Sequence, residues 1–228
     1  MTKKEKRERL ALIIQRLAEI YPDSECALEY GGDPWRLLVM GRLSAQCTDA
    51  RVNEVARELF SVYPSALDMA NADIGELERL VKPCGLYRMK AQNIKDSSRM
   101  LVEDFSGELP SDMESLLLFP GVGRKIANLL IGDIFGGEAI VCDTHCIRIC
   151  GRLGMYPESE KSPDKIEKIL RSLMDARKGP DFCHRIVFFG REICSARSPK
   201  CEECPLSDLC EHNISKNKNA SRANDGDL

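Results

Sequence analysis

A turn near the middle of the chain places two cations at the expected start of a helix. In LLLFPGVGRKIANLL, residues 116–130, Gly121 and Gly123 can adopt positive φ and expose backbone N–H groups. The helix expected after them adds unpaired N–H donors and a partial positive charge, which together form an anion site. Arg124 and Lys125 oppose this dipole, so they favour a bound polyanion at the helix start. From this motif alone, a plain turn between two helices with solvated charges explains the residues equally well.

Four cysteines near the end of the chain have the spacing of metal ligands. In CSARSPKCEECPLSDLC, six, two and five residues separate successive cysteines, and two prolines impose tight turns between them. Zinc sites more often use two close pairs, whereas iron–sulfur clusters accept uneven spacings, so the spacing leaves the metal open. Arg197 and Lys200 lie inside the first gap, where a bound metal would fix them for contact with phosphates. The four expected ligands are Cys194, Cys201, Cys204 and Cys210.

Helices must position these residues, because strand signals are nearly absent. Aromatic residues make up only 6% of the chain, and the apolar residues recur at helical rather than alternating spacing. One stripe at steps of three and four residues predicts a buried helix face: Ala91, Ile94, Ser98, Leu101 and Phe105. Prolines and glycines divide the sequence into about ten short helices. The sequence therefore predicts an all-α fold.

Composition and cysteine usage indicate a reducing compartment. The chain has eleven cysteines, an odd number, and its charged amphipathic start lacks the features of a secretory signal. It contains no apolar run of about eighteen residues, the length that predicts a membrane span. We therefore expect a cytoplasmic protein that is not secreted and, in a prokaryote, associates with the nucleoid. The net charge of −3 does not exclude nucleic acid, because a local basic surface is enough to attract phosphates.

Three further motifs extend the pattern over most of the chain. LSAQCTD at 43–49, FPGVGRKIAN at 119–128 and VCDTHCIRICGRLG at 141–154 occur in this order, followed by the cysteine spacing. Together, from Leu10 to His212, they resemble the endonuclease III family of helix-hairpin-helix base-excision DNA glycosylases. The resemblance implies two helical domains that flank a DNA-binding cleft, and a [4Fe-4S] cluster as the cofactor. It also implies a monomer whose partner is double-stranded DNA with damaged bases or abasic sites.

The same resemblance predicts the domain boundaries. Residues 27–137 are expected to form a six-helix domain that contains the helix-hairpin-helix motif. Residues 1–26 and 138–212 are expected to form a discontinuous helical domain that carries the cluster loop. The polar segment 213–228 has almost no large apolar residues, so we expect a disordered tail there.

The family motif assigns roles to individual residues of this chain. Lys125 matches the nucleophile, and Asp143 matches the essential carboxylate. Gln46 and Leu86 match the residues that fill the gap left when a damaged nucleotide is flipped out of the duplex. The four cysteines match the cluster ligands. The remaining expected DNA contacts are Gly121, Gly123, Arg124, His145, Arg197 and Lys200.

These roles imply a bifunctional DNA glycosylase and AP lyase that excises oxidised pyrimidines from duplex DNA. The Lys125 amine attacks the sugar and stays attached as a Schiff base, which permits β-elimination of the 3′ phosphate. Arg124 and the helix N-terminus both disfavour a protonated amine, and Asp143 stabilises positive charge that develops on the sugar. Two other functions stay open: a monofunctional mismatch glycosylase, and a non-catalytic DNA-binding iron–sulfur protein.

Some of these residues also have structural explanations. Asp143 precedes a predicted helix and Asp is a preferred N-cap, so a capping role and a catalytic role can coexist. A stripe of thiols at every fourth residue, which begins at Cys142, predicts packing in a core rather than a second metal site. Three residues depart from the family pattern: Arg42, Cys142 and Ile126.

Overall fold

The protein is all-helical, as the sequence predicts. The computed structural model describes residues 1–215, and these residues form helices and loops with no strand. The chain divides into two compact units, one formed by Met1–Glu25 with Glu138–Leu228 and the other by Cys26–Gly137. We call the first the two-segment unit and the second the inserted unit. The predicted boundary differs from this division only at Cys26, which lies in the inserted unit.

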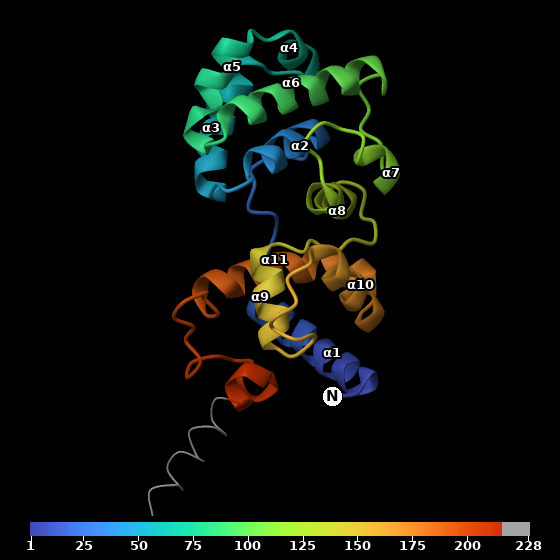
Figure 1. Cartoon of the computed structure of the whole chain (residues 1–228), viewed down its shortest axis with the longest axis vertical. Helices are drawn as coiled ribbons and strands as arrows, with labels where there is room; N and C mark the ends of the chain where they lie inside the picture. The colour runs from blue at the N-terminus through green and yellow to red at the C-terminus, as the bar shows by residue number, and fades with distance from the viewer. Residues whose placement is uncertain (216–228) are drawn as a thin grey trace, which may run out of the picture. The chain divides into compact units, whose positions relative to one another are not determined.

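The inserted unit contains seven α-helices and one 3-10 turn, compared with the six helices that the sequence predicts. The difference of one helix reflects short elements, since α7 is a single turn of four residues. The elements are α2 (Pro34–Leu43), α3 (Asp49–Val62), α4 (Ala66–Asn71), α5 (Ile74–Val81), η1 (Lys82–Cys84), α6 (Tyr87–Glu103), α7 (Met113–Leu116) and α8 (Arg124–Asp133). Helix α6 packs against α2, α4 and α5, while α8 packs against α2 and α7 (Figure 1).

Helix α6 is the central element of this unit because one of its faces is buried along its whole length. Four of the five residues of the predicted stripe are confirmed, since Ala91, Ile94, Ser98 and Leu101 are almost completely buried. The fifth, Phe105, lies beyond the end of α6 and is only partly buried. Ser98 satisfies its hydroxyl by accepting a bond of 2.9 Å from the Trp35 indole N–H and donating to the helix backbone. These contacts join α6 to α2, which carries the chain into the first of the predicted DNA-contacting loops.

The two-segment unit is built from helices that lie on both sides of the insertion. They are α1 (Lys3–Ile20), α9 (Thr144–Arg152), α10 (Pro163–Leu173), η2 (Ala176–Lys178), α11 (Gly179–Glu192) and η3 (Ser207–Leu209). A capping box between Thr2 and Glu5 starts α1, which then packs against α10 and α11. Helix α9 lies against α11 (Figure 1). The predicted thiol stripe is confirmed as core, because Cys142, Cys146 and Cys150 are buried there.

The end of the chain departs in part from the sequence prediction. Residues 211–215 are helical, so residues 213–215 do not belong to a disordered tail. The rest of that predicted tail, 216–228, lies outside the described residues. Among the helices of residues 1–215, none is long and apolar enough to cross a membrane.

Candidate functional site

A backbone hydrogen bond closes the glycine turn before α8, which does not follow directly from the end of a helix. Helix α7 ends at Leu116, and Pro120 lies in the turns that follow it. The Val122 N–H donates to the Phe119 carbonyl at 3.0 Å and closes the turn. Gly121 takes a φ of +78°, a left-handed conformation that a residue without a side chain adopts without steric cost.

A polar platform from α2 and α6 supports this turn. The Asn93 side-chain oxygen accepts from Arg42 Nη2 at 2.8 Å and from Arg42 Nε at 2.9 Å. Ser97 Oγ donates to the Pro120 carbonyl at 2.9 Å. A Cβ on Gly121 would lie only 2.7 Å from Arg42 Cδ and 2.5 Å from the end of the Asn93 amide, so the backbone rests directly on these side chains. Arg42, a departure from the family pattern, is thus a buried support for the turn, and burial lowers its pKa.

The start of α8 presents its backbone N–H groups without a side-chain cap. Gly123 is the N-cap residue, and its carbonyl accepts the first helical bond, from the Ala127 N–H at 3.0 Å. The structure places Arg124 and Lys125 in the first turn with both side chains exposed, as the sequence predicts. Ile126 instead points inward and packs close to Gly41 on α2. An uncapped start with two exposed cations is suited to binding a phosphate.

The two predicted gap-filling residues share an uncommon backbone conformation. Gln46 has a φ of 55° and Leu86 a φ of 49°, and in the described part of the chain Ser106 is the one other non-glycine residue with positive φ. This conformation costs an L-residue about 1–2 kcal/mol. Leu86 is also 48% exposed although it is apolar. Strain and apolar exposure at the same position indicate that function, rather than stability, determines these loops.

Lys90 is a buried residue at this site that sequence reasoning missed. Its side chain is completely buried, and its ammonium donates to three backbone carbonyls in the loops before Gln46 and Leu86. One signal was present in the sequence. Lys90 lies four residues before Ile94, a spacing that puts it on the buried face of α6.

Asp143 caps α9, and part of its carboxylate stays available. Its Oδ1 accepts from the Cys146 N–H at 2.7 Å, and within the described chain no other hydrogen bond to its side chain is found. The structural alternative considered from the sequence is therefore correct, yet it occupies a single oxygen. His145 follows in the first turn of α9, half-buried, with Nδ1 at 3.2 Å from Arg148 Nη2.

The four predicted ligand cysteines line one pocket in the two-segment unit. The pocket has about 400 Å³ of empty volume, and Ile149, Leu153 and Phe189 form part of its wall. In residues 1–215, no three ligand side chains are arranged to hold a single metal ion. Four thiols that line one pocket without converging on a single point fit a four-thiolate cluster better than a lone zinc ion. Burial raises the pKa of the Cys204 thiol to about 11, so a bound cationic centre is needed to keep that ligand as a thiolate.

Two arginines of α9 hold the loop that contains the first of these cysteines. Arg148 donates to the Cys194 carbonyl at 2.9 Å. Arg152 donates to Cys194 Sγ at 3.3 Å and to the Ser195 and Ala196 carbonyls at 2.7 and 2.8 Å. The helix that Asp143 caps is therefore tied directly to the cysteine loop.

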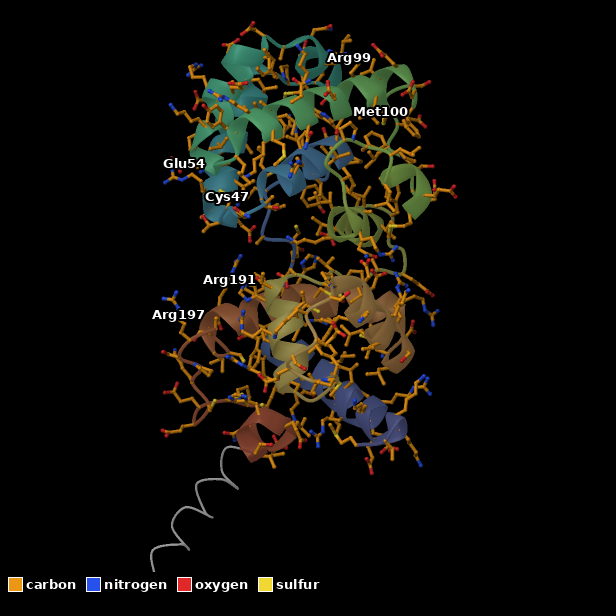
Figure 2. The ribbon with its side chains drawn as sticks, in the orientation of Figure 1. Cys47, Glu54, Arg99, Met100, Arg191 and Arg197 are labelled. Carbon is orange, nitrogen blue, oxygen red and sulfur yellow. The ribbon has the colours of Figure 1, made fainter. Side chains whose placement is uncertain are left out.

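The remaining predicted DNA contacts lie on the same loop. Arg197 and Lys200 are both exposed, and the Lys200 N–H donates to the Ile193 carbonyl at 2.9 Å. Figure 2 shows Arg197 at the same edge of this unit as Arg191, which comes from the last turn of α11. This edge is a cationic surface next to the cysteine pocket.

Comparisons with known proteins agree with these features. Residues 39–176 match the HhH-GPD superfamily of base excision DNA repair proteins, and residues 194–210 match the iron–sulfur binding domain of endonuclease III. The second match spans the four cysteines of the pocket. Endonuclease III of Bacillus subtilis (strain 168) is 39% identical over 214 residues, which cover 92% of this chain and 95% of that protein.

Two solved structures resemble the chain over nearly its whole length. A non-covalent endonuclease III–DNA complex has a TM-score of 0.87 and 38% identity, covering 96% of this chain and 99% of that one. A trapped endonuclease III–DNA covalent intermediate has the same TM-score and identity, covering 95% and 99%. At 38% identity, both resemblances extend beyond the fold alone.

Proposed function

The chain belongs to the endonuclease III family of base excision DNA repair proteins, and from this premise we propose that Lys125 and Asp143 carry its reaction on oxidised pyrimidines in duplex DNA. It is a DNA glycosylase with AP lyase activity. The observation that carries the proposal is an exposed lysine in the first turn of α8, directly after the glycine turn. We further propose that the enzyme works as a monomer in the cytoplasm, where the cysteines that do not bind the cluster stay reduced.

In the proposed reaction the Lys125 amine is the nucleophile. It attacks C1′ of the damaged nucleotide, and the bond from C1′ to the base breaks. The leaving base takes up a proton, and the C1′–O4′ ring bond then opens while the amine loses a proton and O4′ gains one. The nitrogen keeps its bond to C1′ as a Schiff base, which acidifies the neighbouring C2′ proton and permits elimination of the 3′ phosphate.

Asp143 stabilises the positive charge that develops on the sugar when the base leaves. Its capping bond uses Oδ1, which leaves Oδ2 for this electrostatic role. The cap also fixes the side chain, because a carboxylate that accepts a backbone N–H has little rotational freedom. One residue thus starts α9 and presents a preorganised charge.

The other predicted residues share the proposed role of binding DNA. The backbone at Gly121 and Gly123 accepts a phosphate, while Gln46 and Leu86 fill the space that the flipped nucleotide leaves. The cofactor is a [4Fe-4S] cluster, which supplies a rigid link between four thiolates. Cys194, Cys201, Cys204 and Cys210 are its proposed ligands, and their shared pocket supports this assignment. Arg197 and Lys200, exposed on the same loop, are proposed phosphate contacts.

Borohydride trapping tests the nucleophile. The reductant converts a Schiff base into a stable amine, so the wild-type protein should form a covalent band with a duplex that carries one oxidised pyrimidine. Lys125→Ala should form at least about 1,000-fold less adduct. Lys165→Ala is the matched control, because Lys165 is exposed in the first turn of α10 and pairs only with Glu160. Free base released by wild type without any adduct would mean a monofunctional glycosylase, and no reaction on a set of lesions would mean a binding protein.

A second pair of variants separates the two roles of Asp143. Asn caps helices as well as Asp does, so Asp143→Asn should change the free energy of unfolding by less than about 0.5 kcal/mol. Its excision rate should nevertheless fall by about 10²- to 10⁴-fold, because the charge is lost. Asp143→Ala should lose a similar rate and also about 1 kcal/mol of stability. Full activity of Asp143→Asn in single-turnover assays would reduce Asp143 to a cap.

A further inference from the structure

The loops that carry Gln46 and Leu86 come from distant parts of the sequence but lie side by side. The first loop follows α2, and its position is marked in Figure 2 by Cys47, the residue after Gln46. The second loop follows η1 and leads through Gly85 and Leu86 into α6. The Cys47 and Cys84 thiols are in hydrogen-bond contact, and burial together with this contact raises the pKa of Cys84 to about 12.

One side chain joins these two loops. Lys90 Nζ donates at 2.7 Å to the carbonyl of Leu43, the last residue of α2, and at 2.7 Å to the Ala45 carbonyl in the first loop. Its third bond, at 2.8 Å, goes to the Cys84 carbonyl in the second loop. Ala45 directly precedes Gln46, and Cys84 is separated from Leu86 only by a glycine. Each left-handed residue therefore follows a carbonyl whose direction Lys90 determines.

Burial of the Lys90 ammonium costs free energy, which its three hydrogen bonds must offset. The side chain has no exposed surface, and burial lowers its pKa because an ammonium is stripped of water. An ammonium has three N–H donors, and all three have a carbonyl acceptor here. No apolar side chain could replace it without leaving three buried carbonyls unpaired.

We infer that Lys90 is a positioning residue for DNA repair, which fixes both gap-filling side chains, Gln46 and Leu86, in one rigid arrangement. The inference rests on the proposed function, because it presumes that these two residues enter the duplex. Lys90 itself touches neither the sugar nor the base. It acts through the two loops, whose strained backbone would relax without a shared anchor.

A matched lysine on the same helix separates this role from general support of α6. Lys95 lies further along α6 and donates to a single carbonyl, that of Ala72 at 2.6 Å, at the end of α4. Ala72 belongs to neither of the two loops. Lys95→Met therefore removes a lysine–carbonyl bond from α6 and leaves the gap-filling residues anchored.

The test compares Lys90→Met with Lys95→Met on two substrates. The first is a duplex with one oxidised pyrimidine, where the gap must be filled, and the second is a single-stranded abasic oligonucleotide, where there is no gap. Lys90→Met should lower kcat/KM on the duplex by about 100-fold, since misplaced groups of this kind cost that much. Its lyase rate on the single strand should stay within about twofold of wild type, and Lys95→Met should change neither rate by more than that. Rates are normalised to the fraction of molecules that borohydride traps, so unfolded protein does not count.

Fluorescence gives a readout that does not depend on Lys125 chemistry. A 2-aminopurine base placed opposite the lesion brightens when side chains enter the stack, so wild type should raise its signal and Lys90→Met should not. Lys90→Gln keeps two of the three N–H donors, so it should give an intermediate signal, and it replaces the methionine variant if that variant does not fold. Equal losses on both substrates, or an unchanged fluorescence response, would overturn the inference. Absence of a trapped adduct in wild type would instead contradict the proposed nucleophile and leave the fluorescence test of Lys90 valid.

Discussion

The inserted unit and the two-segment unit anchor their proposed DNA-contacting loops with different cations. In the inserted unit a single ammonium, Lys90, gathers carbonyls from two separate loops. In the two-segment unit the guanidiniums of Arg148 and Arg152 bind carbonyls from Gly190 to Ala196 along one stretch of chain. A compact ammonium can collect acceptors that converge on a point, whereas the planar guanidinium fork suits acceptors spread along a segment. The two anchors also differ in redundancy. Two arginines and a cluster hold the cysteine loop, whereas Lys90 alone joins the two loops of the inserted unit.

The largest effect should come from removing a proposed cluster ligand. Cys201→Ser should abolish cluster binding, and the unfolding free energy should fall by more than about 4 kcal/mol because four segments of loop lose their common link. Iron content per chain and urea unfolding measure the two effects. Cys47→Ser is the matched control, since Cys47 is half-buried but lies in the inserted unit, and it should keep its iron. A Cys201→Ser protein with full iron content would show that Cys201 is not needed to hold the cluster, and the cluster could no longer be counted as an anchor at this residue.

The glycine turn of the inserted unit should show the next largest effect. Gly121→Ala adds a Cβ against Arg42 and Asn93 at a positive φ, so it should cost about 2–4 kcal/mol of stability. It should also weaken binding to an abasic duplex by about tenfold, equivalent to about 1.4 kcal/mol. Gly107→Ala has nearly the same φ, +82°, with no atom within 4 Å of the new Cβ, and should cost only about 1 kcal/mol. Equal costs in thermal unfolding would mean that the polar platform yields to the new side chain.

The smallest effect should come from one arginine of the cysteine loop. Arg152→Met removes the bonds to Ser195 and Ala196, but Arg148 still binds the Cys194 carbonyl. The expected loss is about 1–2 kcal/mol in the unfolding free energy, with iron content unchanged. A loss as large as that of Cys201→Ser would show that the guanidinium, and not the cluster, is the main anchor of this loop.

Sequence patterns predicted the parts of the site that depend on local rules. Periodicity identified the buried face of α6, the cysteine spacing identified the pocket, and Asp143 occupies the N-cap position that its place before a helix suggested. In each case the relevant residues lie within a few turns of one another. The all-α fold followed from the helical spacing of the apolar residues and the near absence of strand signals, both of which are local patterns.

The parts that could not be predicted depend on contacts between distant segments. Lys90 bonds the Leu43 carbonyl across 47 positions of sequence, and nothing in the local pattern distinguishes it from a solvated lysine except its place on the α6 stripe. Arg42 has the same character, since its partner Asn93 and the Gly121 backbone come from other elements. Residue propensities also could not predict the left-handed backbone of Gln46 and Leu86, because these residue types rarely adopt it.

The interruption of the two-segment unit has a consequence for how the protein is made. Helix α1 leaves the ribosome first, but the helices that cover Leu10, Ile13 and Leu17 follow only after the insertion. At about 5–20 residues per second, that apolar face waits on the order of 10–30 seconds for α11. The inserted unit is contiguous and can fold during this delay, whereas the cysteine loop emerges afterwards. Iron delivery is therefore a late step of biosynthesis. A nascent chain interrupted before Cys210 would carry an assembled inserted unit but would lack the complete set of proposed thiol ligands for the iron.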